Sequence, residues 1–102
     1  MRAFSIDAPA QLDLLAATVW YEEQREGLGD GFVSAVASVF KRVRDTDEFV
    51  TAPILRLTSA VVRRERTRRF PYAVYFVEDA AARRVIAVLH GGRDPSTWQS
   101  RI

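Results

Sequence analysis

The sequence predicts an α+β domain in which an antiparallel pair of helices packs on one face of an antiparallel sheet. Two amphipathic segments with helical spacing follow one another in the first half of the chain, between residues 12 and 43. Three strand-like segments follow between residues 61 and 89, and two of them are apolar on both faces. Because the chain has 102 residues, we expect a single domain over residues 1–102.

The predicted elements begin with a short strand and a helix. Residues 2–7 alternate, with Phe4 and Ile6 on one face, and this pattern predicts a strand. Asp7 is expected to cap a helix that tolerates Pro9 in its first turn. An apolar stripe then follows one face of this helix and consists of Leu12, Leu15, Ala16, Val19 and Trp20.

A glycine-containing turn separates this helix from a second one. Gly27 is expected to end the first helix, and residues 29–31 to open the second. The second helix repeats the apolar spacing with Phe32, Ala35, Val36, Val39, Phe40 and Val43. Two such helices with a short connection pack as an antiparallel hairpin, and we expect both Trp20 and Phe32 in the core.

The second half of the chain predicts a meander of three strands. The expected segments are a connecting loop (46–60), a charged strand (61–69), two apolar strands (73–77 and 85–89) and a short helix that Asp94 caps. Trp98 is the large apolar residue of that last helix and is expected either to clamp it on the sheet or to contact a partner.

Composition excludes several classes of function. The chain has no cysteine, which excludes disulfides, thiolate zinc sites and a cysteine nucleophile. The chain has a single histidine, His90, so we expect neither a metal site nor a serine triad. We also expect no cofactor. No apolar run is long enough to span a bilayer and no secretory segment is recognised, so a cytoplasmic protein without membrane contact is expected.

Charge is unevenly distributed along the chain. Residues 1–40 hold two basic and six acidic residues, whereas residues 41–70 hold nine basic and four acidic ones. Fourteen of the fifteen basic residues are arginine, which forms forked hydrogen bonds to carboxylate or phosphate. Within the charged strand, Arg64, Arg66 and Arg68 are expected on one face and Arg63 and Arg69 on the other. Such a strand is either a protected sheet edge or an anion-binding rim.

Three stretches, taken in order, suggest a family. They are WYEEQ followed by GLGDGF (residues 20–32), RRFPYAVYF (68–76), and AVLH followed by RDP and a tryptophan (87–98). Together they resemble the ParE branch of the RelE/ParE superfamily, the toxins of bacterial type II toxin–antitoxin pairs. The resemblance implies a growth-inhibiting toxin, with a role in plasmid stabilisation, that a small cognate antitoxin neutralises.

The resemblance implies one of two modes of action that toxins of the RelE/ParE superfamily use. ParE-like toxins bind DNA gyrase and do no covalent chemistry, and this is the function that we expect, with no sequence-specific DNA binding by the chain alone. The alternative is a RelE-like ribosome-dependent mRNA endoribonuclease, whose catalytic residues here would be Arg64, Glu65, Arg66 and His90. A third interpretation is a non-toxic relative that retains only antitoxin binding.

The residues expected to bind antitoxin or target are mainly arginines. They are Arg63, Arg64, Arg66, Arg68, Arg69, Arg93, Trp98 and Arg101. The C-terminal tyrosine of RelE-type sites is absent, and the single lysine, Lys41, lies on the second helix, so a catalytic lysine pair is absent too. These departures favour the gyrase-binding mode over RNA cleavage. His90 is then expected to be a partly buried strand-end residue without a catalytic role.

Overall fold

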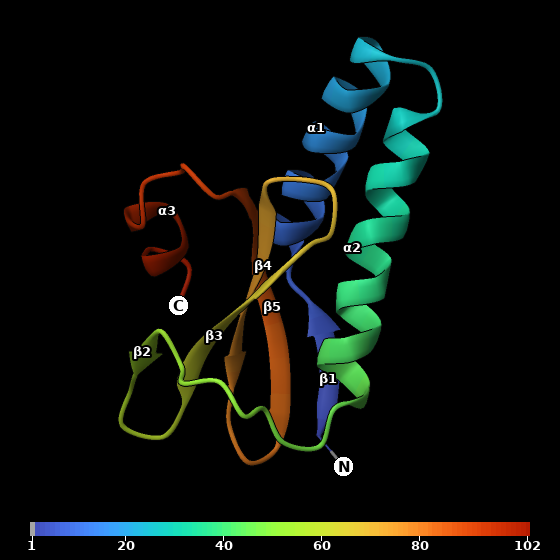
Figure 1. Cartoon of the computed structure of the whole chain (residues 1–102). Coiled ribbons are helices and arrows are strands. Elements are labelled where there is room, and N and C mark those ends of the chain that lie inside the picture. Colours follow the sequence, from blue (N-terminus) through green and yellow to red (C-terminus); the bar gives the residue numbers. More distant parts are fainter. Residues whose placement is uncertain (1) are drawn as a thin grey trace.

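The computed structural model describes residues 2–102 and has the predicted order of elements (Figure 1). The helices are α1 (Ala8–Gln24), α2 (Leu28–Asp45) and the short α3 (Ser96–Gln99). The strands are β1 (Ala3–Ile6), β2 (Leu55–Arg56), β3 (Val61–Arg66), β4 (Tyr72–Glu78) and β5 (Ala82–His90). None of the helices within this part of the chain is long and apolar enough to cross a membrane.

The five strands form one mixed sheet in the order β1-β5-β4-β3-β2. Strands β3, β4 and β5 form the predicted antiparallel meander. Strand β1 pairs with β5 in parallel, with Ala3 opposite Ala82, so the sheet is not antiparallel throughout. The predicted loop over residues 46–60 contains β2, which pairs only with Val61 and Val62 of β3.

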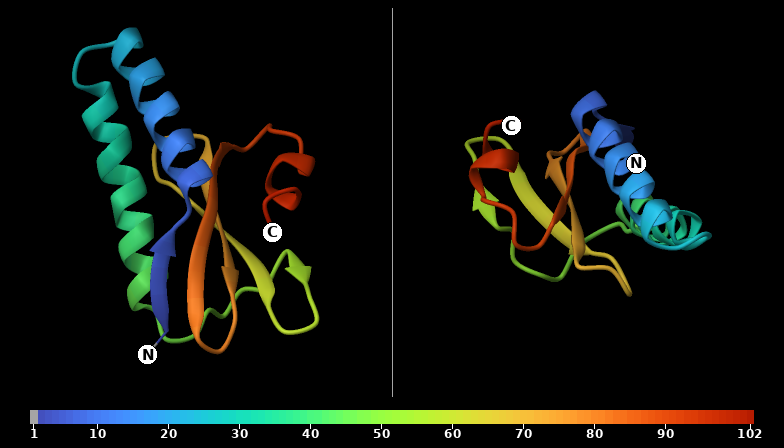
Figure 2. Two further views of the ribbon diagram at one scale, coloured as in Figure 1. Left: turned by 180° about the vertical axis from the view of Figure 1, so that it is seen from behind. Right: turned by 90° about the horizontal axis from the view of Figure 1, so that it is seen from above.

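Two hydrophobic layers lie on opposite faces of this sheet. The helical hairpin covers one face, and α3 covers the other (Figures 1 and 2). On the hairpin side, α2 contributes Phe32, Val36, Val39 and Val43, all of which are buried. On the other side, Trp98 packs with Tyr75 and five further residues, Val62, Ala73, Ile86, Ala87 and Leu89. The predicted burial of Phe32 is therefore confirmed.

The turn between α1 and α2 depends on close backbone approach. Helix α1 ends at Gln24, before Gly27, and Gly27 adopts a left-handed conformation (φ 86°) directly before α2, so it caps the start of the second helix and does not end the first as predicted. Gly29 is buried against α1, where a Cβ atom would lie 2.9 Å from the carbonyl oxygen of Thr18. The Glu22 carboxylate accepts the N–H groups of Gly27 and Gly29, at 3.0 and 2.9 Å, and so satisfies free donors at the start of α2.

The burial of α1 differs from the expectation. The side of α1 that packs on the core consists of Ala10, Leu14, Ala17 and Tyr21. The predicted stripe lies on the outer side instead, and Trp20 is 55% exposed. The prediction that Trp20 belongs to the core is therefore wrong, because the small side of α1 allows closer packing on the sheet than the bulky side would.

Candidate functional site

The arginines of β3 are divided between the two faces of the sheet, because side chains alternate along a strand. Arg64 and Arg66 are exposed and lie on the α3 face, opposite Tyr75 and Ala73 of β4. Arg63 and Glu65 lie on the hairpin face, where Glu65 bonds Arg42 of α2 at 3.1 Å. The predicted alternation of Arg63 and Arg64 is confirmed.

Arg68 and Arg69 do not continue this alternation. Strand β3 ends at Arg66, three residues before its predicted end, because the Thr67 hydroxyl donates to the carbonyl groups of Phe70 and Tyr72 and closes a turn. Arg69 has a positive φ of 70° in this turn. The expectation that Arg68 shares a face with Arg64 is therefore wrong.

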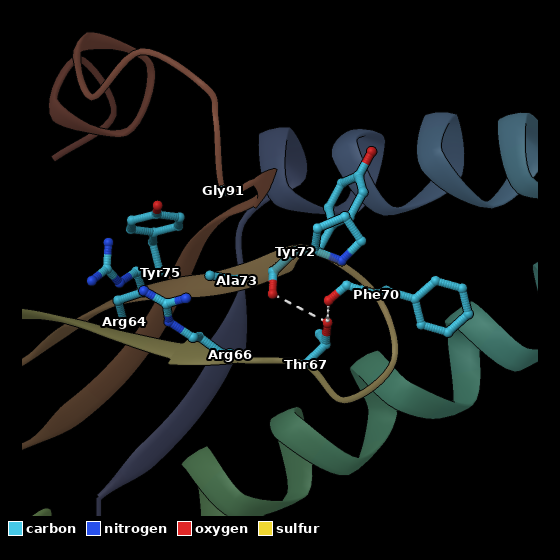
Figure 3. A pocket seen from close by; sticks show the side chains of 9 residues that line it. Arg64, Arg66, Thr67, Phe70, Tyr72, Ala73, Tyr75 and Gly91 are labelled. Atoms are coloured by element: carbon cyan, nitrogen blue, oxygen red, sulfur yellow. Dashed lines mark hydrogen bonds between the residues drawn. The ribbon is translucent and has the colours of Figure 1, made fainter.

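Arg64 and Arg66 line a hollow on the α3 face of the sheet (Figure 3). The hollow has a volume of about 190 Å³, and its other walls include Phe70, Tyr72 and Tyr75. In the close view both guanidinium groups stand near the Tyr75 ring, away from α1 and α2. Neither arginine has an ion-pair partner among residues 2–102. Two such cations next to aromatic surface are suited to binding carboxylate or phosphate groups.

Arg68 and Arg69 lie at a second hollow, between the turn after β3 and α2. Small side chains of α2 line it together with Arg42, and its volume is about 510 Å³. The guanidinium of Arg69 also lies 5.3 Å from the centre of the Phe70 ring. The five arginines between residues 63 and 69 that were predicted to bind a partner thus lie at three separate places. The structure does not bring them together in one site.

Arg63 is engaged inside the molecule. Its Nε donates to Glu78 at 3.0 Å and its Nη1 to the Thr51 carbonyl at 2.8 Å. Glu78 also accepts the Nε of the buried Arg83 at 2.7 Å. Burial opposes ionisation of Glu78, but the hydrogen bonds from Arg83 and Arg63 outweigh it and hold the pKa of the carboxyl below its ordinary value. Arg63 is therefore placed to stabilise the fold.

His90 lies on the hairpin face at the end of β5. Its ring packs edge-on against Tyr72 with the ring centres 5.5 Å apart, and its Nδ1 accepts the N–H of Gly92 at 3.0 Å. Glu65 is on the same face of the sheet but is paired with Arg42. Arg64 and Arg66 are on the opposite face, so the four residues of the ribonuclease alternative do not converge on one site.

The C-terminal segment is fixed to the rest of the fold. Trp98 is 8% exposed and stacks on Tyr75 at 5.6 Å between ring centres. Arg101 bonds both carboxylate oxygens of Asp13 and the Ile86 carbonyl. The bond to Asp13 outweighs the effect of burial and raises the pKa of Arg101. Of the two roles expected for Trp98, the structure shows the clamp on the sheet, and Arg101 ties the same segment to α1.

Arg93 alone among the predicted C-terminal residues is exposed beside an open surface. It lines a hollow of about 230 Å³ between α1 and the end of β5, together with Trp20 and His90. This hollow continues into the outer side of α1, which we call the α1 stripe. The α1 stripe consists of Leu12, Leu15, Val19 and Trp20, each 51–66% exposed.

The α1 stripe is a candidate binding surface that sequence reasoning missed. The helical spacing of its residues was visible in the sequence, but that spacing alone indicates core packing. The informative signal was the second apolar row of Ala10, Leu14, Ala17 and Tyr21, because only one of two rows can face the sheet. No group of residues that could hold a metal ion is found in the described part of the chain, residues 2–102.

The geometry defines a small α+β protein whose exposed cationic and apolar surfaces are suited to binding a macromolecule. The fold is similar to a solved structure described as the chromosomal ParDE TA system from P. aeruginosa, with a TM-score of 0.72 and 13% identity. The similarity covers 88% of this chain and 96% of that chain. The fold implied by the ParE resemblance is thereby confirmed. No protein-family profile and no curated protein matches the sequence.

Proposed function

We propose that this protein is the toxin of a type II toxin–antitoxin pair, that a cognate antitoxin neutralises it, and that it acts on DNA gyrase without covalent chemistry. The shared fold with a chain of a ParDE system supports the first part. The hollow lined by Arg64 and Arg66, together with the exposed α1 stripe, supports a function that depends on binding another macromolecule.

The observation that carries the proposal is the exposure of the α1 stripe. Leu12 is 66% exposed, Leu15 60% and Trp20 55%, all on one side of one helix. Contiguous apolar surface of this kind on a soluble protein marks a site of interaction with another protein. An antitoxin that covers the α1 stripe would bury this surface permanently, as the partners of obligate complexes do.

The arrangement of the polar residues argues against the ribonuclease alternative. General acid–base catalysis requires the acid or base within hydrogen-bond reach of the reacting group that the cationic residues hold. His90 and Glu65 face the hairpin, whereas Arg64 and Arg66 face α3. The sheet itself separates the two sets, so one phosphodiester group would not reach both.

Co-expression with the product of the adjacent small gene tests the first part. We expect a complex that survives purification and buries on the order of 2,000 Å² or more in total. Trp20→Ser should weaken it, whereas Val33→Ser, a matched change at an exposed position of α2, should not. A neighbour that fails to co-purify at low and moderate salt would contradict the proposal.

The target is tested in cells and with purified enzyme. We expect gyrase-dependent DNA breaks on expression and intact mRNA. His90→Ala should leave growth inhibition unchanged at equal protein level, since a catalytic histidine would instead contribute about 10²–10⁴-fold. Site-specific mRNA cleavage that His90→Ala abolishes would establish the ribonuclease alternative.

A further inference from the structure

The second hollow, between α2 and the turn that follows β3, is lined by charge of one sign. We call it the α2 hollow, and its volume is about 510 Å³. Its polar and backbone lining consists of Gly31, Ser34, Ser38, Arg42, Arg68 and Arg69. Three of these residues are arginines, and none of the residues that line the hollow is acidic. The α2 hollow therefore favours an anionic ligand.

Arg69 is held over α2 by an unusual backbone conformation. Its φ of 70° lies in the left-handed region, which glycine adopts at a lower cost than a residue with a side chain. The guanidinium lies over Gly31, where a Cβ atom would be 3.6 Å from Nη1 of Arg69. The bonds from the Thr67 hydroxyl to the Phe70 and Tyr72 carbonyl groups hold the turn in this shape. Backbone strain that the surrounding structure maintains in this way is typical of ligand sites.

The cations of the α2 hollow are available to a ligand. Arg68 and Arg69 are exposed and form no ion pair with any other of residues 2–102. Arg42 is fixed at the edge of the hollow, because its Nε bonds Glu65 at 3.1 Å and its Nη2 bonds the Arg66 carbonyl at 3.3 Å. These two bonds orient the guanidinium and leave further N–H donors for a ligand. A guanidinium that is already oriented loses less entropy when it binds.

The lining of the hollow indicates which phosphate ligand fits. None of the lining residues is aromatic. A single strand or a free nucleotide is bound largely through stacking of its bases on aromatic side chains. The backbone of a duplex keeps its bases stacked on one another and requires only cations and hydroxyl donors. Ser34 and Ser38, one turn apart on α2, provide hydroxyl groups beside the arginines.

An acidic polypeptide is the other polyanion that the arginines could bind. An extended peptide gains much of its affinity from backbone hydrogen bonds to the protein that binds it. Along α2 the backbone groups are already bonded within the helix, so this wall of the hollow does not provide such partners. The site therefore favours the phosphate backbone of a duplex.

We propose that the α2 hollow binds the phosphate backbone of duplex DNA through Arg42, Arg68 and Arg69, without recognising its sequence. The choice of DNA rests on the proposed function, because a chain that acts on DNA gyrase works beside the duplex that the enzyme holds. The contact orients the chain on the complex of enzyme and DNA, while its other surfaces remain free for protein partners.

The salt dependence of DNA binding provides the direct test. The full chain, separated from its antitoxin and refolded, is titrated into a fluorescent duplex of about 20 bp. Three phosphate contacts predict a slope of about −2.7 for log K against log salt concentration, or about 40-fold weaker binding at 200 mM than at 50 mM salt. Arg68→Ala and Arg69→Ala should each reduce the steepness by about 0.9. A native chain that does not bind the duplex at 50 mM salt overturns the inference.

The other exposed arginines provide a control for position. Arg64→Ala combined with Arg66→Ala removes two cations from the hollow on the α3 face and should leave the slope unchanged. If this double variant loses DNA binding while Arg68→Ala and Arg69→Ala retain it, the α2 hollow is not the site and the inference is overturned.

A pair of variants with equal net charge separates local contact from overall charge. Ser38→Glu places a carboxylate in the α2 hollow, whereas Ala37→Glu places one at the neighbouring exposed position of α2, outside the lining. Ser38→Glu should bind the duplex about tenfold more weakly than Ala37→Glu at low salt, because it cancels one phosphate contact. Equal affinities would mean that only net charge matters and would contradict the proposed site. Thermal unfolding of each variant checks that the fold is retained.

Purified gyrase distinguishes failure of the inference from failure of the proposed function. We expect the native chain to increase gyrase-dependent cleavage of supercoiled DNA, and Ser38→Glu to do so less than Ala37→Glu. If the native chain has no effect on gyrase but Ser38→Glu selectively loses duplex binding, the proposed function fails and the phosphate site stands. If both variants increase cleavage as strongly as the native chain does, the hollow has no part in the action on gyrase and the inference is overturned.

Other polyanions serve as ligand controls. A single strand of the same length should bind more weakly than the duplex and with a shallower slope, about −0.7 per contact against about −0.9. A single strand, an RNA duplex or a polyglutamate peptide that binds more tightly than duplex DNA would overturn the assignment to duplex DNA.

Discussion

Arg83 is a buried cation that connects three segments of the chain. Its guanidinium donates to Glu78 of β4, to the Val43 carbonyl near the end of α2 and to the carbonyl groups of Thr46 and Asp47. Its carbon also lies 4.9 Å from the centre of the Phe49 ring. The buried charge is therefore compensated on every side, as low-dielectric surroundings require.

Glu78 should be essential for this arrangement. Glu78→Gln removes the negative charge but keeps the size of the side chain, and leaves Arg83 buried without its counter-charge. We expect a loss of about 3–5 kcal/mol in the free energy of unfolding, measured with urea. Glu48→Gln is the control, because its side chain is 80% exposed and its contact with Arg2 is long at 3.9 Å. A loss below about 1 kcal/mol would mean that the pair contributes little.

Stability should also depend on pH through Glu78. The pKa of this carboxyl is lower in the folded chain than in the unfolded one, so the unfolded chain binds the proton more readily as pH falls. The stabilisation is present above the ordinary glutamate pKa of about 4.3 and is lost as pH falls through the folded value. Urea midpoints between about pH 6 and pH 3 should therefore fall less steeply in Glu78→Gln than in the native chain.

Trp20 and Phe32 should contribute very differently to the free energy of unfolding, although both were predicted to lie in the core. Phe32 is fully buried, and Phe32→Ala should lower the free energy of unfolding by about 3–5 kcal/mol. Trp20 is more than half exposed, and Trp20→Ala should change it by less than about 1 kcal/mol. Thermal unfolding of both variants measures the difference. Comparable losses would place Trp20 in the core after all.

At the scale of elements, the two helices show what periodicity can and cannot predict. In α2 the buried apolar residues, Phe32, Val36, Val39 and Val43, all belong to the stripe that the spacing indicates, and Ala35 and Phe40 of that stripe are partly buried. In α1 two apolar rows lie on opposite sides, and the bulkier row faces solvent. Spacing therefore predicted that α1 is a helix but not which side packs, because that choice depends on how closely the helix approaches the sheet.

The strands were predicted well where the apolar pattern was strong and less well where polar residues decide the structure. Apolar β4 and β5 were predicted, although β5 extends to Ala82 because Arg83 finds buried partners. The end of β3 depends on a hydroxyl of Thr67 that bonds two carbonyl groups, and no local pattern indicates this. The candidate site shares this limitation, since the partners of Arg63 and Arg101 are distant in the sequence.

The C-terminal element should be structural. Deleting residues 94–102 removes Trp98 from the apolar layer and leaves Asp13 without Arg101. We expect a loss comparable to that of a buried tryptophan, about 3–5 kcal/mol, seen as a lower melting temperature. Removing Ile102 alone, which is 43% exposed, is the control. A truncated chain as stable as the native one, but without growth inhibition, would instead assign the segment to target binding.

At the scale of the whole molecule, the free chain has an apolar stripe on one side and a cationic edge on another. Without a partner, we expect the purified chain to self-associate through the α1 stripe as its concentration rises. Sedimentation should show this, and Leu15→Gln with Trp20→Ser should reduce it. Association that depends only on salt, and not on these two residues, would place the contact on the arginines instead.

The parallel pairing of β1 with β5 determines when this fold is completed during synthesis. Ala3 lies beside Ala82, and Asp13 bonds Arg101, which follows it by 88 residues. Contacts between residues so far apart form slowly, because a long loop must close first. A nascent chain still lacking β5 and α3 has neither the strand that joins β1 to β4 nor the Arg101 clamp on α1. The fold of residues 2–102 is therefore expected to be completed only after β5 and α3 have been synthesised.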